Sequence, residues 1–232
     1  TLLKLGVMMF FSFLILPIFL VLGYYYRVLD TATHGMINGD DKLPKFDDLT
    51  SMFVDGLKVF LVKFIYLLIP CIIFLASLII GGQISGLNNN VGSGVMFVGI
   101  IISIILAILF YFLSIMAVSN MVANNGSIKD AFDYKSIWKI ISNVGWLRYI
   151  GFYLGLIIII TVISIIVGII LALIWITLGI SGAFVSAFGL NIGLIIGLLI
   201  TISVYLFLIS PYLTIFESRA IGLIYEPLDG DD

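Results

Sequence analysis

Four long, uninterrupted apolar segments constrain this chain more than any other feature. They cover residues 59–81, 95–122, 149–177 and 190–216, and charged residues are almost absent from them. A hydrocarbon core about 30 Å thick is crossed by about 20 apolar residues of α-helix. The apolar residues run continuously instead of alternating with polar ones, which excludes the strands of a membrane barrel. The sequence therefore predicts an all-α, polytopic transmembrane helix bundle with four full spans.

The composition excludes a water-soluble globular fold. Only 10% of the residues are charged and 62% are hydrophobic, whereas a soluble domain carries about 25% charged residues. So few charges cannot cover a compact body in water, and the excess apolar surface requires lipid. The net charge of −2 offers no electrostatic basis for binding nucleic acid. We expect membrane lipids, and no nucleic acid, among the partners.

The first apolar segment, residues 2–28, has two interpretations. Pro17 lies near its middle, and a proline there removes a backbone donor and kinks or breaks a helix. The segment is either a fifth span or a re-entrant hairpin of two half-helices that turns at Ile15–Pro17. A turn at membrane depth must find its hydrogen-bond partners inside the protein.

The connections differ completely in positive charge. Lysine and arginine gather in 27–63, in 123–148 and at Arg219, whereas 82–94 and 178–189 contain neither. The positive-inside rule places the charged connections and the C-terminus in the cytoplasm and the neutral loops outside. The glycines of 81–94 then suggest a flexible linker. We expect a multi-pass protein of the plasma membrane.

Each cytoplasmic connection ends in an amphipathic stretch, at 46–57 and at 132–147. Apolar residues at helical spacing predict two interfacial helices lying at headgroup level. An aromatic belt is expected beside the second one, formed by Trp138, Trp146, Tyr149 and Tyr153. Interfacial helix, span, neutral loop and span thus occur over 46–122 and again over 132–216, which indicates a faint internal repeat.

Four strings carry a resemblance to a known family: LGYYYRVLD (22–30), LPKFDDLTSMFVDGLKVFLVKFIYLLIP (43–70), KDAFDYKSIWKIISNVGWLRYIGFYLG (129–155) and SPYLTIFESRAIGLIY (210–225). The chain resembles the domain of unknown function 4013 family, which consists of small, mostly archaeal, polytopic membrane proteins. We expect one transmembrane domain over 1–225, followed by an acidic tail at 226–232. The resemblance implies no activity and no catalytic residues.

The residues offer no catalytic or metal-binding constellation. His34 is the only histidine and Cys71 the only cysteine, which excludes a histidine–carboxylate metal cluster, a Ser-His-Asp triad and an internal disulfide. Phosphate-binding loops and nucleophile elbows are missing as well. We therefore expect a protein that is not an enzyme and needs no cofactor.

Two sets of residues stand out as candidate sites. The first is a group of charges at the expected cytoplasmic boundary, which could form ion pairs across helices or bind a lipid headgroup: Arg27, Asp55, Lys58, Lys63, Glu217 and Arg219. The second is a set of helical glycines that would let helices pack closely, either within the chain or against a partner subunit: Gly151, Gly155, Gly168, Gly189, Gly193 and Gly197.

These features favour a non-enzymatic membrane scaffold or accessory subunit, with a membrane-protein partner or a second copy of the chain on its glycine faces. A transporter or channel for a small solute or lipid is the alternative, with its path lined by polar residues of the spans: Ser103, Ser114, Asn120, Thr201, Ser203 and Ser210. A lipid-modifying enzyme comes third, and it would require converging acidic side chains at the cytoplasmic boundary.

Overall fold

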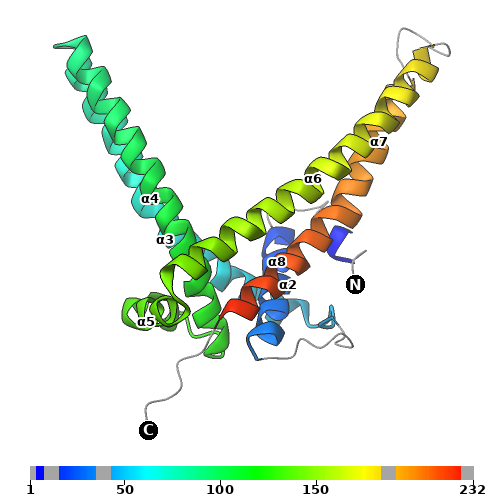
Figure 1. Cartoon of the computed structure of the whole chain (residues 1–232), viewed down its shortest axis with the longest axis horizontal. Helices are drawn as coiled ribbons and strands as arrows, with labels where there is room; N and C mark the ends of the chain where they lie inside the picture. The colour runs from blue at the N-terminus through cyan, green and yellow to red at the C-terminus, as the bar shows by residue number, and fades with distance from the viewer. Residues whose placement is uncertain (1–3, 8–15, 35–42, 184–191, 226–232) are drawn as a thin grey trace. The chain divides into compact units, whose positions relative to one another are not determined.

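The computed structural model describes residues 4–7, 16–34, 43–183 and 192–225, and it is helical nearly throughout with no strand in these ranges. Figure 1 shows the helices in order. They are α2 (Leu16–Thr33), α3 (Leu49–Ser85), α4 (Asn89–Ala123), η2 (Asp130–Phe132), α5 (Tyr134–Val144), α6 (Trp146–Ala183), α7 (Ile192–Val204), η3 (Tyr205–Ile209) and α8 (Ser210–Ile224). The all-α prediction is confirmed.

Four helical stretches are long and apolar enough to cross a membrane: Leu49–Ser85, Asn89–Ala123, Trp146–Ile180 and Ile192–Ile224. They coincide with the four spans predicted from the sequence, so the chain is a multi-pass integral membrane protein. Each is longer than the apolar segment that predicted it. A helix of 37 residues, such as α3, is about 55 Å long, well beyond the hydrocarbon core.

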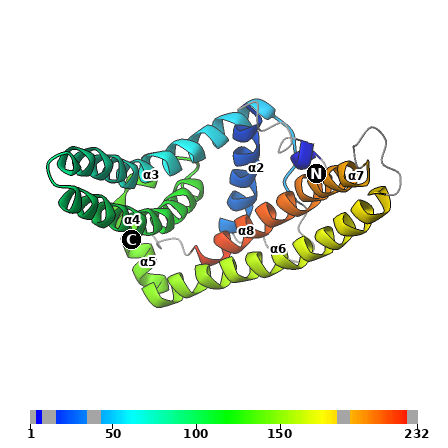
Figure 2. The same cartoon turned by 90° about the horizontal axis from the view of Figure 1, so that it is seen from above.

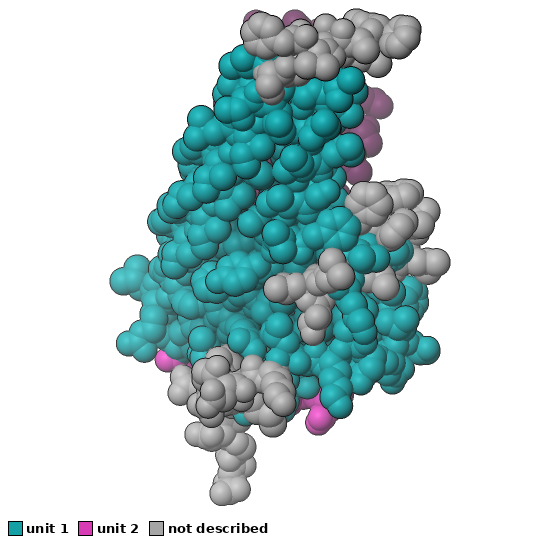
Figure 3. Space-filling model, turned by 90° about the vertical axis from the view of Figure 1, so that its right-hand side faces the viewer, with its two compact units in different colours: residues 1–56, 144–224 teal, residues 57–143, 225–232 magenta. Residues whose placement is uncertain are grey.

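The chain forms two compact units, coloured separately in Figure 3. Unit 1 comprises residues 1–56 and 144–224, and unit 2 comprises residues 57–143 and 225–232. Each unit contains one pair of spans, but the unit boundaries do not follow the predicted copies 46–122 and 132–216, so the internal repeat stays a prediction. The single transmembrane domain expected over 1–225 stays a prediction.

In unit 2, α3 and α4 form an antiparallel hairpin (Figures 1 and 2). Its turn is only residues 86–88, and the Asn88 side chain caps α4 by accepting a hydrogen bond from the Val91 amide. The prediction of a loop over 82–94 is wrong. Gly81, Gly92 and Gly99 are helical, and a Cβ atom on any of them would overlap atoms of the facing helix. These glycines pack the hairpin and do not form a flexible linker.

The two expected interfacial helices end differently. The stretch 46–57 is not a separate helix, because α3 begins at Leu49 and continues without a break into the span. The second stretch is separate: α5 ends at Val144, and Gly145 takes a left-handed φ of 91° before α6 begins. Glycine is the residue that adopts this conformation without steric cost, and it commonly terminates helices.

In unit 1, α6 lies beside α7 (Figures 1 and 2). The partner of α6 is continuous from α7 through η3 to α8, and η3 is a π-helical turn in which the Ser210 amide bonds to the Tyr205 carbonyl. Pro211 explains the wider turn, because its ring clashes with the carbonyl four residues earlier in a regular α-helix.

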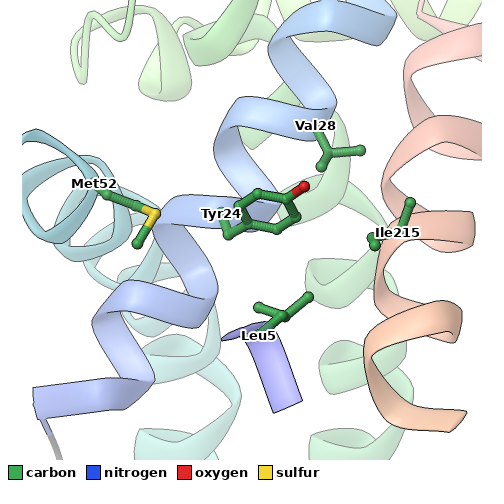
Figure 4. Packing of buried hydrophobic residues seen from close by; sticks show 5 residues of the cluster. All are labelled: Leu5, Tyr24, Val28, Met52 and Ile215. Carbon is green, nitrogen blue, oxygen red and sulfur yellow. The ribbon is translucent and has the colours of Figure 1, made fainter. Parts of the chain in front are cut away.

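Helix α2 occupies the core of unit 1. Leu5, Tyr24, Val28, Met52 and Ile215 form a buried cluster around it, shown in Figure 4. The described part of α2 begins at Leu16, so Pro17 lies in its first turn, where a missing amide costs no hydrogen bond. A break at Pro17 was expected, but residues 8–15, including the turn at Ile15, lie outside the described ranges.

Candidate functional site

Arg27, a charge of the predicted boundary group, makes several hydrogen bonds to the backbone. It lies on α2 and holds the irregular residues 43–48 against that helix. Its guanidinium donates to the carbonyls of Lys45 at 3.0 Å, Asp47 at 2.7 Å and Asp48 at 3.2 Å, and to the Asp47 carboxylate at 3.2 Å. The Tyr24 hydroxyl adds a bond to the Pro44 carbonyl at 3.2 Å. With four acceptors engaged, Arg27 fastens the chain where it enters α3.

The remaining charges of this group are divided between the units. Asp55, Glu217 and Arg219 belong to unit 1 with Arg27, whereas Lys58 and Lys63 belong to unit 2. All five side chains are half-buried. The cluster of six therefore stays a prediction. Arg27 forms its ion pair with Asp47, which does not belong to the predicted group.

A smaller acidic arrangement lies at the end of α2. Asp30 lies 3.4 Å from His34, the residue that directly follows α2. Burial raises the pKa of the Asp30 carboxyl above its ordinary value, His34 opposes that shift, and the negative charge of Asp55 adds to it. His34 thus contacts a carboxylate of the preceding helical turn. Among the described residues, no three histidine, cysteine or acidic side chains could hold a metal ion.

A buried polar network in unit 2 was not predicted from the sequence, although one of its members, Asn120, stood among the candidate residues. The Asn120 amide donates to the Asp130 carbonyl at 2.8 Å, and its oxygen accepts from the Tyr225 hydroxyl at 2.9 Å and from Asn124 at 3.1 Å. Tyr66 donates to the Ala131 carbonyl at 2.9 Å. Burial, reinforced by the charge of Asp130, raises the pKa of Tyr225 to about 12. The network joins η2 and Tyr225 to the α3–α4 hairpin.

Asn120 was expected to line a path in the transporter alternative, and the network gives it another role. Three further hydroxyls of that proposed lining bond to carbonyls of their own helix: Ser103 to Gly99, Ser114 to Tyr111 and Thr201 to Gly197. A side chain satisfied by its own backbone needs neither water nor solute. The hydrogen bonds of these four residues therefore give no support to a water-filled path.

The predicted glycine faces separate into two kinds. Gly193 and Gly197 are buried in α7, and a Cβ on Gly197 would overlap the Trp175 ring of α6. In contrast, a Cβ at Gly151, Gly155 or Gly168 of α6 would meet nothing within 4 Å among the described residues. Gly197 therefore packs α7 against α6 inside unit 1, whereas Gly151, Gly155 and Gly168 make no such close approach to the described residues. Gly189 lies outside the described residues.

Helix α5 is amphipathic, and the protein itself covers its apolar face. Ile137, Ile140 and Ile141 are at most 1% exposed. Trp138, at 60% exposed, and the half-exposed Tyr134 lie on the outer face, together with Lys135 and Lys139. The outer face is therefore aromatic and basic, a composition suited to the headgroup region.

The expected aromatic belt is also only partly exposed. Tyr149 and Tyr153 are buried in unit 1, with their rings edge to face at 4.9 Å between centroids. Trp138 alone among the four expected residues is clearly exposed. The sequence pattern identified the aromatic residues, but it did not show which of them the protein buries.

Comparison with known proteins identifies a family whose function is unknown. A family model described as "Protein of unknown function (DUF4013)" matches residues 9–172. No curated protein and no solved structure matches the chain. The matched region extends from the first apolar segment into α6 and agrees with the resemblance seen in the sequence.

Proposed function

Because this chain belongs to the DUF4013 family of proteins of unknown function and has four helices able to cross a membrane, we propose that it is a non-enzymatic membrane scaffold. Its span surfaces assemble with a partner membrane protein, as an accessory subunit would. Its basic connections and C-terminus face the cytoplasm and contact anionic lipid of the plasma membrane.

The observation that carries this proposal is the small share of each span that the protein itself covers. In the most apolar windows of α4 and α6, 6% of the residues are buried, against 22% in α3 and 11% in the α7–α8 span. Lipid can cover such surfaces, but so can other helices, since packing of small residues drives association in a bilayer. Gly151 and Gly155, one turn apart on α6, offer an open place for close approach.

The polar groups support this proposal over transport. The hydroxyls of Ser103, Ser114 and Thr201 bond within their own helices, and Asn120 belongs to a satisfied buried network. A solute path requires polar groups that exchange partners as the solute passes. The contact of Arg27 holds the protein's own backbone, which is a structural task.

The test is recovery of the assembly from native membranes under gentle extraction, with a double variant, Gly151→Leu and Gly155→Leu. Both positions have room for a side chain in unit 1, so the variant should fold and lose its partner. Gly94→Leu is the matched control, because this exposed α4 glycine also has nothing within 4 Å among the described residues.

We expect a stoichiometric partner with the parent chain and the control, and loss of that partner with the double variant. Recovery of the parent chain alone, in a monodisperse form holding only lipid, would overturn the scaffold proposal. A second copy of the chain as the partner would replace the accessory subunit by a homo-oligomer.

A further inference from the structure

Unit 1 contains a hollow between α6 and the helix that runs from α7 into η3. Its volume is about 330 Å³, which lies within the range of small-ligand sites. The wall on α6 consists of residues on one helical face, including Ser164, Gly168, Ala172 and Trp175, and the facing wall includes Thr201 and Tyr205. All of these residues belong to candidate membrane-spanning helices.

The hollow exists because both of its walls depart from close packing. On α6, Ser164, Gly168 and Ala172 present little or no side chain, and a Cβ on Gly168 would meet nothing within 4 Å among the described residues. On the opposite side, Tyr205 begins the π-helical turn that Pro211 imposes. Small residues usually bring helices together in lipid, whereas these leave a space unfilled.

Three polar side chains around the hollow already donate to backbone carbonyls. Ser164 donates to the Ile160 carbonyl at 2.7 Å, Thr201 to the Gly197 carbonyl at 2.8 Å, and the Trp175 indole to the Leu194 carbonyl at 3.3 Å. A cavity holds water only when it offers several polar partners. The lining therefore favours an apolar occupant.

The hollow is continuous with the lipid-facing surface of the spans. Trp175 and Tyr205, both on its rim, are 43% and 50% exposed, whereas Leu171 in its wall is 7% exposed. From Ser164 to Trp175 the wall rises about 16 Å along α6, close to half of a hydrocarbon core about 30 Å thick. Trp175 lies toward the end of α6, and tryptophan favours the headgroup level of a membrane. The hollow thus has the depth of one lipid leaflet and opens sideways into it.

We propose that this hollow binds one hydrocarbon chain of a membrane lipid, which enters beside Trp175 and extends toward Ser164. The chain fills the space that the small residues of α6 leave, and the rings of Trp175 and Tyr205 flank it. The site is independent of the partner surface proposed above, since Gly151 and Gly155 do not line it.

The test is quenching of Trp175 fluorescence by a phosphatidylcholine with brominated chains. The full chain carries Trp138→Phe and Trp146→Phe, so that Trp175 is its only tryptophan, and it is delipidated in detergent before titration. Gly168→Leu fills the hollow. Gly151→Leu is the matched control, because it places the same side chain at an open position of the same helix outside the hollow.

We expect quenching that saturates at one lipid per chain in the parent and in Gly151→Leu, with a midpoint raised about tenfold or more in Gly168→Leu. Ala172→Leu fills the same hollow and should act alike, which keeps the test decisive if one variant fails to fold. The same non-saturating quenching in all variants would overturn the site. So would an unquenched Trp175 in a dimeric parent, because a second copy would then occupy the hollow.

Discussion

Helix α2 crosses the first turns of α3 at close range in unit 1, and Gly23→Ala tests this contact. A Cβ on Gly23 would overlap the carbonyl group of Met52, and one on Gly56 would overlap the carbonyl oxygen of Phe19. These are backbone atoms, which no rotamer change can move aside. An added methyl group must therefore push the two helices apart.

The size of the effect follows from comparison with Gly151→Ala. Both replacements favour the helix by about 1 kcal/mol through propensity, but only the change at Gly23 adds an overpacking cost of about 1–3 kcal/mol. The difference between the variants should therefore be about 1–3 kcal/mol. At about 2–4 °C per kcal/mol for a chain of this size, Gly23→Ala should melt about 2–12 °C below Gly151→Ala.

The assay is thermal unfolding of both purified variants in the same detergent, followed by near-ultraviolet circular dichroism. The double variant Gly23→Ala with Gly56→Ala should lose less stability than the sum of the single losses, because helices already separated accommodate the second methyl group more easily. Equal melting temperatures for Gly23→Ala and Gly151→Ala would refute the reasoning, since the crossing would then have room for a side chain.

Three further predictions concern separate parts of the chain. Arg27→Met should destabilise the fold by about 1.5–3 kcal/mol in chemical unfolding, whereas Asp47→Asn, at a 64% exposed side chain, should cost less than about 1 kcal/mol; equal losses would contradict the assignment of the stabilisation to backbone carbonyls. Tyr225→Phe should cost about 0.5–1.5 kcal/mol at neutral pH. Because the folded-state pKa of Tyr225 is raised from 10.0 to about 12, its stabilisation is complete below pH 10.0 and is lost as the pH rises toward 12, so the variant should show a weaker alkaline loss of stability; identical pH profiles would count against the buried hydroxyl. Lys135→Cys should react with an impermeant thiol reagent from the cytoplasmic side and Asn90→Cys from the outside, and the reverse pattern would invert the proposed orientation.

The positions of the spans could be predicted from composition because a bilayer leaves few solutions for a long apolar segment. In lipid every backbone polar group must bond within its own segment, so a continuous apolar run becomes a helix whatever its neighbours do. The α3 and α6 spans follow directly from that rule. What composition could not supply was the length of the helices beyond the apolar core.

The helix breaks illustrate this limit. Both copies of the repeat place a glycine between an amphipathic stretch and a span, Gly56 in one and Gly145 in the other. Gly145 takes a positive φ and separates α5 from α6, whereas Gly56 stays helical inside α3 because α2 crosses there and needs the space. The same residue type terminates one helix and packs another, and only the tertiary contact decides between them.

The sequence indicated which residues of the candidate site stand out, but not which groups they bond to. Arg27 stood out as a charge at the boundary, yet its acceptors are mainly carbonyls of residues 45–48, which no charge pattern indicates. Asn120 stood out as a polar residue in a span. Its partner Asp130 belongs to η2, and its partner Tyr225 directly follows α8. Every residue has a backbone carbonyl, so a side chain that bonds to backbone has a partner that cannot be recognised from residue type.

The open glycines of α6 connect these observations to function. A glycine inside a helix costs about 1 kcal/mol relative to alanine, and at Gly151, Gly155 and Gly168 no contact among the described residues offsets that cost. At Gly197 the offset is visible, because the Trp175 ring occupies the place of the missing side chain. At these open glycines, the proposed lipid chain would fill the space at Gly168 and the proposed partner helix the space at Gly151 and Gly155. One substitution at each place therefore tests the two proposals independently.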